Sequence, residues 1–428
     1  MKVSGLDKIL TAAARRGWFG RRAQVEALIP LGKAERRMTG AERSACIARF
    51  HQQYPNCSGV QLHSFPCSRI GELISRWIAI AIDAGANAEN GIIHVYVPLG
   101  EECNSRLMRI MRRQFTIISN KDAAFWKAIL MGTKDRLWEN YLKYNVRRED
   151  LAIPSEILDN LIVLSDEELA EAEEKMRAMG LHQPYVCISS RDVAYLKKTQ
   201  PENDCFYHDY RDSKITMCSK AAEYLKDQRI QTVRVGRYVK GRADFSSCID
   251  YANDYYDELL DIALPKFSKF FLSDSNGINL LGYASNVPVA LKNLIPLNDG
   301  WGSIPQSDKG LFICKRYFLK AENRYLSIRE ILDLEARGGD EVWYTEFYQK
   351  NGIEVVENTA EDILDLVTEM NERLDGTWEE TEESIQMQER VQKMLHDDMV
   401  RTGKEYHACL HCNISINFLK HNPFLLDP

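Results

Sequence analysis

Short β-rich runs alternate with amphipathic helices along most of this chain, and that rhythm restricts its fold more than any other feature. It is typical of a parallel sheet wrapped by helices, because consecutive parallel strands need a long crossover that a helix usually supplies. In the first half we expect strands at Val60–Phe65, Ile92–Val97 and Phe115–Ser119, and helices at Ile70–Asp83, Asn104–Arg113 and Lys121–Met131.

The same alternation returns after a boundary near residue 165. Ser165 and Glu168 carry the sequence signature of a capping box, which predicts a helix from there to Met179. Beyond it we expect strands at Tyr185–Ser189, Thr232–Gly236, Lys269–Ser273 and Pro288–Leu291, and helices at Ile215–Leu225, Tyr255–Ala263 and Gly277–Ala284.

Near the C-terminus, apolar residues recur on one face of each of two expected helices, and Gly376 supplies the stop between them. The sequence therefore predicts an α/β protein with two Rossmann-like domains facing across a cleft. The expected divisions are a basic N-terminal helical extension (1–58), an N-terminal domain (59–164), a C-terminal domain (165–358) and C-terminal helices with a tail (359–428).

Composition excludes several classes of protein. Of the 428 residues 45% are hydrophobic, which rules out a disordered or fibrous chain. The formal net charge is −7, whereas nucleic-acid coat proteins are normally basic, so we expect no nucleic-acid partner. No stretch reaches the ~18 apolar residues of a membrane span, and no signal-peptide block is evident, which favours a cytoplasmic protein with reduced cysteines.

The N-terminal segment is basic, with nine Lys and Arg against three acidic residues in positions 1–40. Trp18 and Phe19 lie between two Arg pairs, which suits weak contact with an anionic membrane surface. A basic helix packed on its own domain is the interpretation we favour, because Gly17 and Gly20 interrupt any helix there.

Four potential metal ligands, His407, Cys409, His411 and Cys412, lie within six residues. Zinc sites usually combine two such pairs at a distance, and the sequence has no second close CxxC pair. We therefore expect no metal here, and read the cluster as incidental soft residues of a C-terminal segment.

Candidate functional residues follow predicted strands of the second half, where open α/β sheets bind their ligands. Arg191 comes after the first of these strands and can bind phosphate or carboxylate through a bidentate fork. A structural salt bridge, for example to Asp192, is an equally good interpretation.

The segment before the next predicted helix is dense in titratable groups. It contains His208, Asp209 and Arg211, and such density is typical of a binding or proton-transfer site. Asp212 or Ser213 fits an N-cap role. His208 or Asp209 is the candidate general base, while a structural role for a lone His stays open.

Basic residues also surround the end of the strand at Gly236. Arg234 lies inside the strand, and Arg237, Lys240 and Arg242 follow it. Gly236 permits close backbone approach and the basic side chains suit a diphosphate, the alternative being a solvated basic loop. Arg234 needs a partner if the strand is buried.

A fourth loop runs from Ser273 through Asp274, Ser275, Asn276 and Gly277 into a helix. Unpaired N–H groups and the dipole at a helix start favour an anion, although the same residues also make ordinary turns. Taken together, the four loops predict an anion-binding site.

The first half offers Arg69, Gly71 and Glu72 at a strand-to-helix junction, as possible contacts for a second substrate. Solvated loop charge is the simpler interpretation. The signature motifs of dinucleotide-binding, P-loop, zincin and α/β-hydrolase enzymes do not occur where they would be needed.

The chain resembles a little-characterised family of bacterial glycosyltransferase-like proteins found with surface-polysaccharide genes. The resemblance spans about residue 60 to the end and depends on the ordered motifs SRIGEL (68–73), SSRD with Tyr195 (189–195), YHDYRDS (207–213), VRVG (233–236), the segment Asp250–Leu264, FFLSDSNGI (270–278), VPVALKN (287–293) and the tail NISINFLKHNPFLL. It implies a GT-B fold whose C-terminal helices cross back onto the first domain.

The resemblance also implies a nucleotide-sugar donor, held mainly by the second domain, and a glycan or lipid-linked glycan acceptor. Arg191, Arg237 and the Ser275–Gly277 turn would meet the charge that develops on the leaving phosphate. His208 or Asp209 would take the proton of the acceptor hydroxyl. We expect no metal and no other cofactor, because the triplet Asp274-Ser275-Asn276 lacks the second acid of a DxD motif.

The sequence leaves two other functions open. A nucleotide-sugar epimerase on the same fold would need acid and base groups on both sides of the sugar and no acceptor. A non-catalytic nucleotide-sugar or glycan-binding protein would need neither His208 nor Asp209, since fold alone does not determine function.

Overall fold

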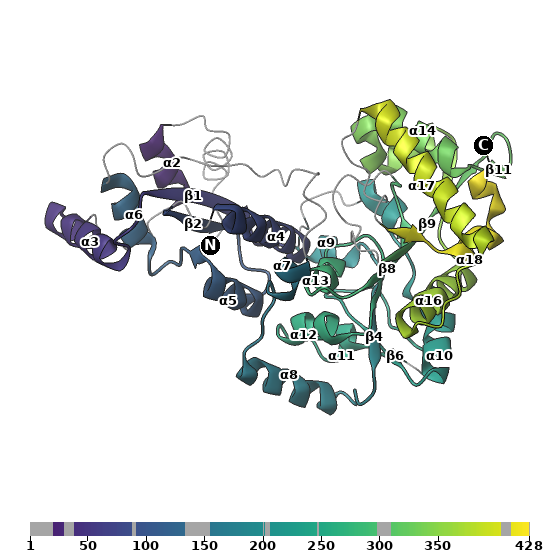
Figure 1. The fold of residues 1–428 in the computed structure, drawn as a ribbon, viewed down its shortest axis with the longest axis horizontal. Coiled ribbons are helices and arrows are strands. Elements are labelled where there is room, and N and C mark those ends of the chain that lie inside the picture. Colours follow the sequence, from purple (N-terminus) through teal and green to yellow (C-terminus); the bar gives the residue numbers. More distant parts are fainter. Residues whose placement is uncertain are drawn as a thin grey trace. The chain divides into compact units, whose positions relative to one another are not determined.

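The computed structural model describes residues 20–29, 38–87, 91–132, 155–199, 201, 206–245, 248–297, 310–403 and 412–427. Internal contacts divide the chain into two compact units, Met1–Val146 and Arg147–Pro428 (Figure 1). Most of the basic N-terminal segment and the potential ligands His407, Cys409 and His411 lie outside the described residues, whereas Cys412 is described and buried.

The first unit contains a parallel three-stranded sheet in the order β1-β2-β3. Apolar residues of β1 and β2 pack with Phe50, Trp126 and Ile129 to form its core. The elements are β1 (Gly59–Pro66), β2 (Ile92–Leu99), β3 (Thr116–Ile117), α2 (Arg21–Leu28), α3 (Gly40–Gln53), α4 (Ile70–Asn87), α5 (Ser105–Gln114) and α6 (Ala123–Gly132). All strands and helices predicted for this half are present.

The second unit is built on a seven-stranded sheet in the order β13-β9-β8-β7-β4-β5-β6, and every neighbouring pair is parallel. Its strands are β4 (Tyr185–Ile188), β5 (Gln231–Arg234), β6 (Cys248–Ile249), β7 (Phe271–Ser273), β8 (Val289–Leu294), β9 (Leu311–Cys314) and β13 (Asn413–Ile414). The central strands are buried throughout, as expected for a parallel sheet covered on both faces.

The chain winds outward from β4 through β5 to β6, then returns to β7 beside β4 and winds the other way through β8 and β9. This is the strand order 3-2-1-4-5-6 of a Rossmann sheet. The order reverses between β4 and β7, and ligands of such sheets bind at this switch point, outside the carboxyl ends of the strands.

The helical elements of the second unit are connections between strands and a C-terminal group. They are α7 (Ser155–Asp159), α8 (Asp166–Ala178), α9 (Ala194–Thr199), η2 (Phe206–Arg211), η3 (Ile215–Cys218), α10 (Ser219–Asp227), α11 (Tyr251–Asp254), α12 (Leu260–Phe267), α13 (Asn279–Ala284), α14 (Ile328–Gly338), η4 (Gly339–Trp343), α15 (Thr345–Lys350), α16 (Ala360–Asp375), α17 (Glu382–Thr402), α18 (Ile416–His421) and η6 (Pro423–Leu426).

Two helix predictions are confirmed in detail. Ser165 Oγ accepts a hydrogen bond from the Glu168 backbone N–H, and the Glu168 carboxylate accepts one from the Ser165 backbone N–H, which completes the capping box of α8. Gly376 adopts the left-handed conformation (φ 70°) that ends α16.

One prediction is wrong: the helix expected from Tyr255 begins only at Leu260, because Asp257 Oδ1 accepts hydrogen bonds from the N–H groups of Leu259 and Leu260.

The C-terminal segment completes the second unit. Helix α16 packs on α10, β8 and β9, α17 packs on α14 and α18, and β13 adds the edge strand beside β9 (Figure 1). A small antiparallel sheet, which the sequence pattern did not indicate, precedes α16 in the chain and contains β10 (Arg316–Leu319), β11 (Arg324–Tyr325) and β12 (Ile353–Val356).

The predicted α/β class, with two units each built around a parallel sheet, is confirmed. The facing arrangement across a cleft and the return of the C-terminal helices to the first domain stay predictions. No described helix combines the length and apolar character needed to cross a bilayer.

Candidate functional site

The loops after β4 and β7 meet directly at the switch point of the second sheet. Ser189 Oγ lies 2.7 Å from Ser273 Oγ, and the Arg191 backbone N–H donates to Asp274 Oδ2 at 2.6 Å. These contacts tie together two segments that are more than eighty residues apart in the chain. The position is the one where a Rossmann sheet binds its ligand.

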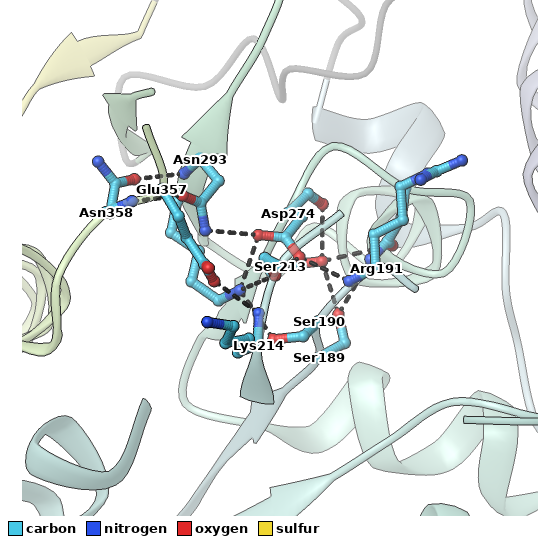
Figure 2. A network of polar contacts seen from close by, with 12 residues as sticks. Ser189, Ser190, Arg191, Ser213, Lys214, Asp274, Asn293, Glu357 and Asn358 are labelled. Atoms are coloured by element: carbon cyan, nitrogen blue, oxygen red, sulfur yellow. Dashed lines mark hydrogen bonds and ion pairs between the residues drawn. The ribbon is translucent and has the colours of Figure 1, made fainter. Parts of the chain in front are cut away.

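Asp274 is the centre of a buried polar network (Figure 2). Its Oδ1 accepts hydrogen bonds from Lys292 Nζ at 2.7 Å and Asn293 Nδ2 at 3.2 Å, while its Oδ2 also accepts one from Ser213 Oγ at 2.5 Å. Burial disfavours the charged form of Lys292, but the Asp274 carboxylate outweighs that effect and raises the lysine pKa. Both side chains are at most 2% exposed, so this is a fully desolvated ion pair.

A second buried lysine holds the η2 segment in place. Lys315 Nζ donates to the backbone oxygens of Tyr210 and Asp212, at 2.9 and 2.6 Å. Burial lowers the Lys315 pKa to about 8. Lys315 therefore fixes the backbone of the segment that carries the predicted residues His208, Asp209 and Arg211.

Asparagines from β8 and from the segment before α16 complete the network. Asn293 and Asn358 exchange backbone-to-side-chain hydrogen bonds of 2.6 and 2.7 Å, and Asn293 has a left-handed backbone (φ 55°). Beside them the Lys214 backbone N–H donates to Glu357 Oε1 at 2.5 Å (Figure 2). This hydrogen bond connects the loop before η3 to the segment that precedes α16.

Two guanidinium groups lie close together at this edge of the sheet. The side chain of Arg191 pairs with Asp212 and also donates to His208 O, and Arg211 Nη2 donates to Ser275 O at 2.6 Å. Burial and the neighbouring Arg211 lower the Arg191 pKa. The Arg211 Nε is buried and has no hydrogen-bond partner among the described residues. A bound anion would relieve this like-charge repulsion and supply the missing acceptor.

The candidate bases lie on the same segment. His208 is half-buried with its ring centroid 3.8 Å from that of Tyr207, and Asp209 is exposed. Burial raises the pKa of the adjacent Asp212 carboxyl to about 6, despite the attraction of Arg191. The general-base roles of His208 and Asp209 stay predictions.

Asp192, in the loop after β4, contacts the loop after β5 at the same edge of the sheet. Its Oδ2 accepts a hydrogen bond from the Lys240 backbone at 2.7 Å, which links the β4 and β5 loops. Gly236 has φ 139°, and a side chain there would meet Val239 at 3.0 Å. The Arg237 guanidinium lies 4.5 and 4.9 Å from the ring centroids of Tyr256 and Tyr238.

Three residues predicted to contact a donor, Arg234, Ser273 and Asp274, are buried and bind protein partners. Arg234 is 1% exposed and binds Gly241 O at 2.8 Å and Asp250 at 3.5 Å, so it stabilises the β5 loop from inside. Ser273 and Asp274 are equally buried and satisfied by protein partners. These three side chains position the loops, and their contacts with a donor stay predictions.

The predicted anion site at the start of α13 also differs in the structure. Asn276 Oδ1 accepts hydrogen bonds from the N–H groups of Ile278 and Asn279, at 3.2 and 3.3 Å. Helix α13 has only six residues, so its dipole is small. Asn276 therefore satisfies N–H groups at the start of the helix. The Ser275 carbonyl accepts a hydrogen bond from Arg211, and Gly277 is half-buried.

In the first unit, Arg69 and Glu72 form an ion pair at the start of α4, and Gly71 O accepts a hydrogen bond from Ser75 Oγ at 2.8 Å. Both charged side chains are 38% exposed, which agrees with either solvated charge or a substrate contact. Among the described residues no group of three or more His, Cys, Asp or Glu side chains is placed to hold a metal ion.

Sequence reasoning missed Lys292, Lys315 and Asn293. The signal was present in part, because Lys292 interrupts the apolar run VALKNL and Lys315 directly follows LFIC. A lysine inside a buried strand needs a partner, as a buried arginine such as Arg234 does.

No protein-family model matches the chain, and no curated protein matches its sequence. Among solved structures it is similar to a glycosyl transferase family 9 protein from Veillonella parvula DSM 2008, at 11% identity over 55% of this chain and 81% of that chain, with a TM-score of 0.37. It is also similar to E. coli ADP-heptose LPS heptosyltransferase II, at 12% identity over 54% and 84% of the two chains (TM-score 0.33). A third structure is the heptosyltransferase TibC in complex with ADP-D-beta-D-heptose, at 12% identity over 55% and 59% (TM-score 0.30).

Proposed function

We propose that the protein is a glycosyltransferase that moves a sugar from a nucleotide-activated donor to a glycan or lipid-linked glycan acceptor. The observation that supports this best is the meeting of Arg191 and Arg211 at the switch point of a Rossmann-ordered sheet. Paired guanidinium groups with a spare buried donor suit the phosphates of a nucleotide sugar.

In the proposed reaction the bond between the sugar and the nucleotide phosphate breaks as the acceptor hydroxyl attacks the anomeric carbon. Arg191 and Arg211, with Arg237 on the neighbouring loop, stabilise the negative charge that develops on the leaving phosphate. His208 or Asp209 accepts the proton of the acceptor hydroxyl. Because arginine side chains meet the phosphate charge, the proposed reaction needs no divalent metal.

The buried lysines serve the site indirectly. Lys292 holds Asp274, which fixes the Arg191 backbone, and Lys315 holds the backbone carbonyls beside Arg211. Such rigidity keeps the guanidinium groups in place before the donor arrives, which is the condition for strong electrostatic stabilisation. We further propose that the acceptor contacts Arg69 and Glu72 of the first unit, and that the product is a bacterial surface polysaccharide made at the cytoplasmic side.

A thermal-shift screen against nucleoside monophosphates, nucleoside diphosphates and nucleotide sugars tests the proposal. A ligand at about 100 times its dissociation constant adds about 2.7 kcal/mol to the free energy of unfolding. We expect at least one nucleotide sugar to stabilise the protein, and its nucleoside diphosphate to do so as well. If none of these ligands raised the thermal stability of the protein, the result would contradict the donor site and favour a glycan-binding protein.

Incubation of the protein with the stabilising donor alone separates the enzyme classes. An isomerised donor would indicate an epimerase, whereas transfer that requires a glycan acceptor supports the transferase. Activity that chelator abolishes and manganese restores would contradict the metal-independent reaction.

A further inference from the structure

A pocket of about 260 Å³ lies outside the switch-point site, in the C-terminal part of the second unit. Its walls come from α16, α17, β13, α18 and the loop between α16 and α17, with Arg373, Glu380, Ile385, Gln388, Asn413 and Ile416 among the lining residues. Strand β13 is the edge strand of the sheet, and β9 and β8 separate it from β7. The pocket is therefore a different place from the site built around Arg191 and Asp274.

The feature that marks the pocket is the amide of Gln388. Both polar atoms of this side chain, Oε1 and Nε2, are buried, and neither has a hydrogen-bond partner among the described residues. A buried unpaired polar group costs about 1–3 kcal/mol, so a native protein rarely keeps one without a reason. A ligand that presents one acceptor and one donor side by side would satisfy the whole amide after a change of side-chain rotamer.

The charges around the pocket disfavour a phosphorylated ligand. Arg373 is the basic lining residue, and its guanidinium is already bound to Glu369 at 2.9 and 3.0 Å and to Glu380 at 3.3 Å. The exposed Glu389 adds a further negative charge to the rim. With its cation neutralised by two carboxylates, the pocket suits a neutral ligand.

The remaining lining residues combine planar polar groups with apolar surface. Asn413 presents a second amide, and Ile385, 45% exposed, and Ile416 present aliphatic carbons. Amide and carboxylate groups can hydrogen-bond to neighbouring hydroxyls, while aliphatic carbons pack against a methyl group or a ring face. The volume is just below the roughly 300–1,000 Å³ of sites for drug-sized molecules, which limits the ligand to about one ring.

We propose that this pocket binds an N-acetylated sugar residue, with the acetamido group of the sugar paired to the Gln388 amide. The carbonyl of the acetamido group accepts from Nε2, its N–H donates to Oε1, and its methyl group packs against Ile385. The pocket would hold one residue of a glycan away from the transfer site, so this inference does not depend on the transferase reaction.

Titration of the whole protein with N-acetyl-D-glucosamine and with D-glucose, followed by ligand-observed NMR, tests the acetamido pairing. We expect N-acetyl-D-glucosamine to bind at least about tenfold more tightly than glucose, a difference of about 1.4 kcal/mol, because glucose lacks both the rigid C=O and N–H pair of the acetamido group and the methyl group that packs against Ile385. Equal affinity for the two sugars, or no binding of either at millimolar concentration, would overturn the proposal.

The Gln388→Met variant separates binding from folding. Methionine has a similar shape without polar hydrogen-bonding groups, so it removes an unpaired buried amide and the melting temperature should stay the same or rise. We expect the variant to lose at least about tenfold in affinity for N-acetyl-D-glucosamine. Unchanged affinity in Gln388→Met would remove this residue from the site.

Gln386→Met is the matched control, because Gln386 is exposed on the same helix and its Nε2 lies 3.4 Å from Glu382. This control should bind the sugar as the unsubstituted protein does. Thermal stabilisation by nucleotides should be the same in both variants, so failure of the pocket and failure of the donor site give different results.

Discussion

The ammonium group of Lys292 lies 2.7 Å from Oδ1 of Asp274, and both side chains are almost completely shielded from solvent. Lys292 comes from the central strand β8, and Asp274 directly follows the neighbouring strand β7. The pair therefore joins the interior of the sheet to the loop that fixes Arg191. Removing one partner of such a pair leaves an uncompensated buried charge.

Replacement of Lys292 by methionine should accordingly lower the free energy of unfolding by about 3–5 kcal/mol. Methionine fills a similar volume, so the loss comes mainly from the unpaired Asp274 carboxylate. Urea unfolding followed by circular dichroism measures the change through the shift in midpoint.

Lys320→Met is the control for this prediction. Lys320 is 61% exposed and pairs with Glu354 at 3.7 Å, so its loss should cost no more than about 1 kcal/mol. If both variants unfold at the same urea concentration, the buried pair does not have the importance assigned to it.

The side chain of Arg191 should matter for nucleotide binding. Its backbone N–H, which holds Asp274, is unaffected by substitution, so Arg191→Lys keeps the loop contact and a positive charge but loses the planar fork. We expect affinity for a stabilising nucleoside diphosphate to fall about tenfold or more, corresponding to a charge-assisted hydrogen bond of about 1.5–3 kcal/mol. Isothermal titration calorimetry measures this directly.

An arginine elsewhere on the second unit provides the comparison. Arg242 is 50% exposed and pairs with Asp254 at 2.7 Å, outside the network around Asp274. Arg242→Lys should leave nucleotide affinity unchanged. Equal affinities of the Arg191 and Arg242 variants would exclude Arg191 from the donor site.

Local sequence signals predicted most of the fold because they act over a few residues. The Ser165 capping box and the Gly376 stop require only neighbours in the chain, and both are present. Hydrophobic periodicity likewise located the central strands. The start of α12 was missed because the Asp257 side chain competes with the helix for the first N–H groups.

The site was harder to predict because its contacts cross the sheet. Lys292 and Asp274 are eighteen residues apart, and Arg191 and Asp274 are eighty-three apart, so only the strand order brings them together. The basic loop after β5 was recognised, but the sequence could not show that Arg234 turns inward to Asp250 while Arg237 stays at the surface. Parallel pairing of β13 with β9 depends on two segments about a hundred residues apart.

The stability of the protein should depend on the ionisation of Asp261. Burial raises the pKa of this carboxyl to about 7, while the Tyr251 hydroxyl donates to it at 2.8 Å. The ordinary value in the unfolded chain is 3.8, so the folded state binds the extra proton. The contribution of Asp261 to stability is therefore fully present below about pH 4 and is lost as the pH rises through about 7.

Comparison with Asp261→Asn isolates this effect, since asparagine stays neutral at every pH and can still accept the tyrosine hydrogen bond. The two proteins should have similar stability near pH 4, and the variant should be more stable by up to a few kcal/mol at pH 8. Urea unfolding at several pH values measures the difference. Parallel stability curves over this range would contradict the raised pKa.

Arg237 should contribute to nucleotide binding with little effect on folding. Its guanidinium lies against Tyr256 and Tyr238, which are 40% and 38% exposed, so the cation–π contacts stabilise the fold by only about 0.5–1 kcal/mol. Arg237→Ala should therefore melt within a few degrees of the unsubstituted protein but bind the nucleoside diphosphate about tenfold more weakly. Tyr256→Phe keeps the ring beneath the guanidinium and should bind normally. Equal melting together with unchanged nucleotide affinity in Arg237→Ala would place Arg237 outside the site.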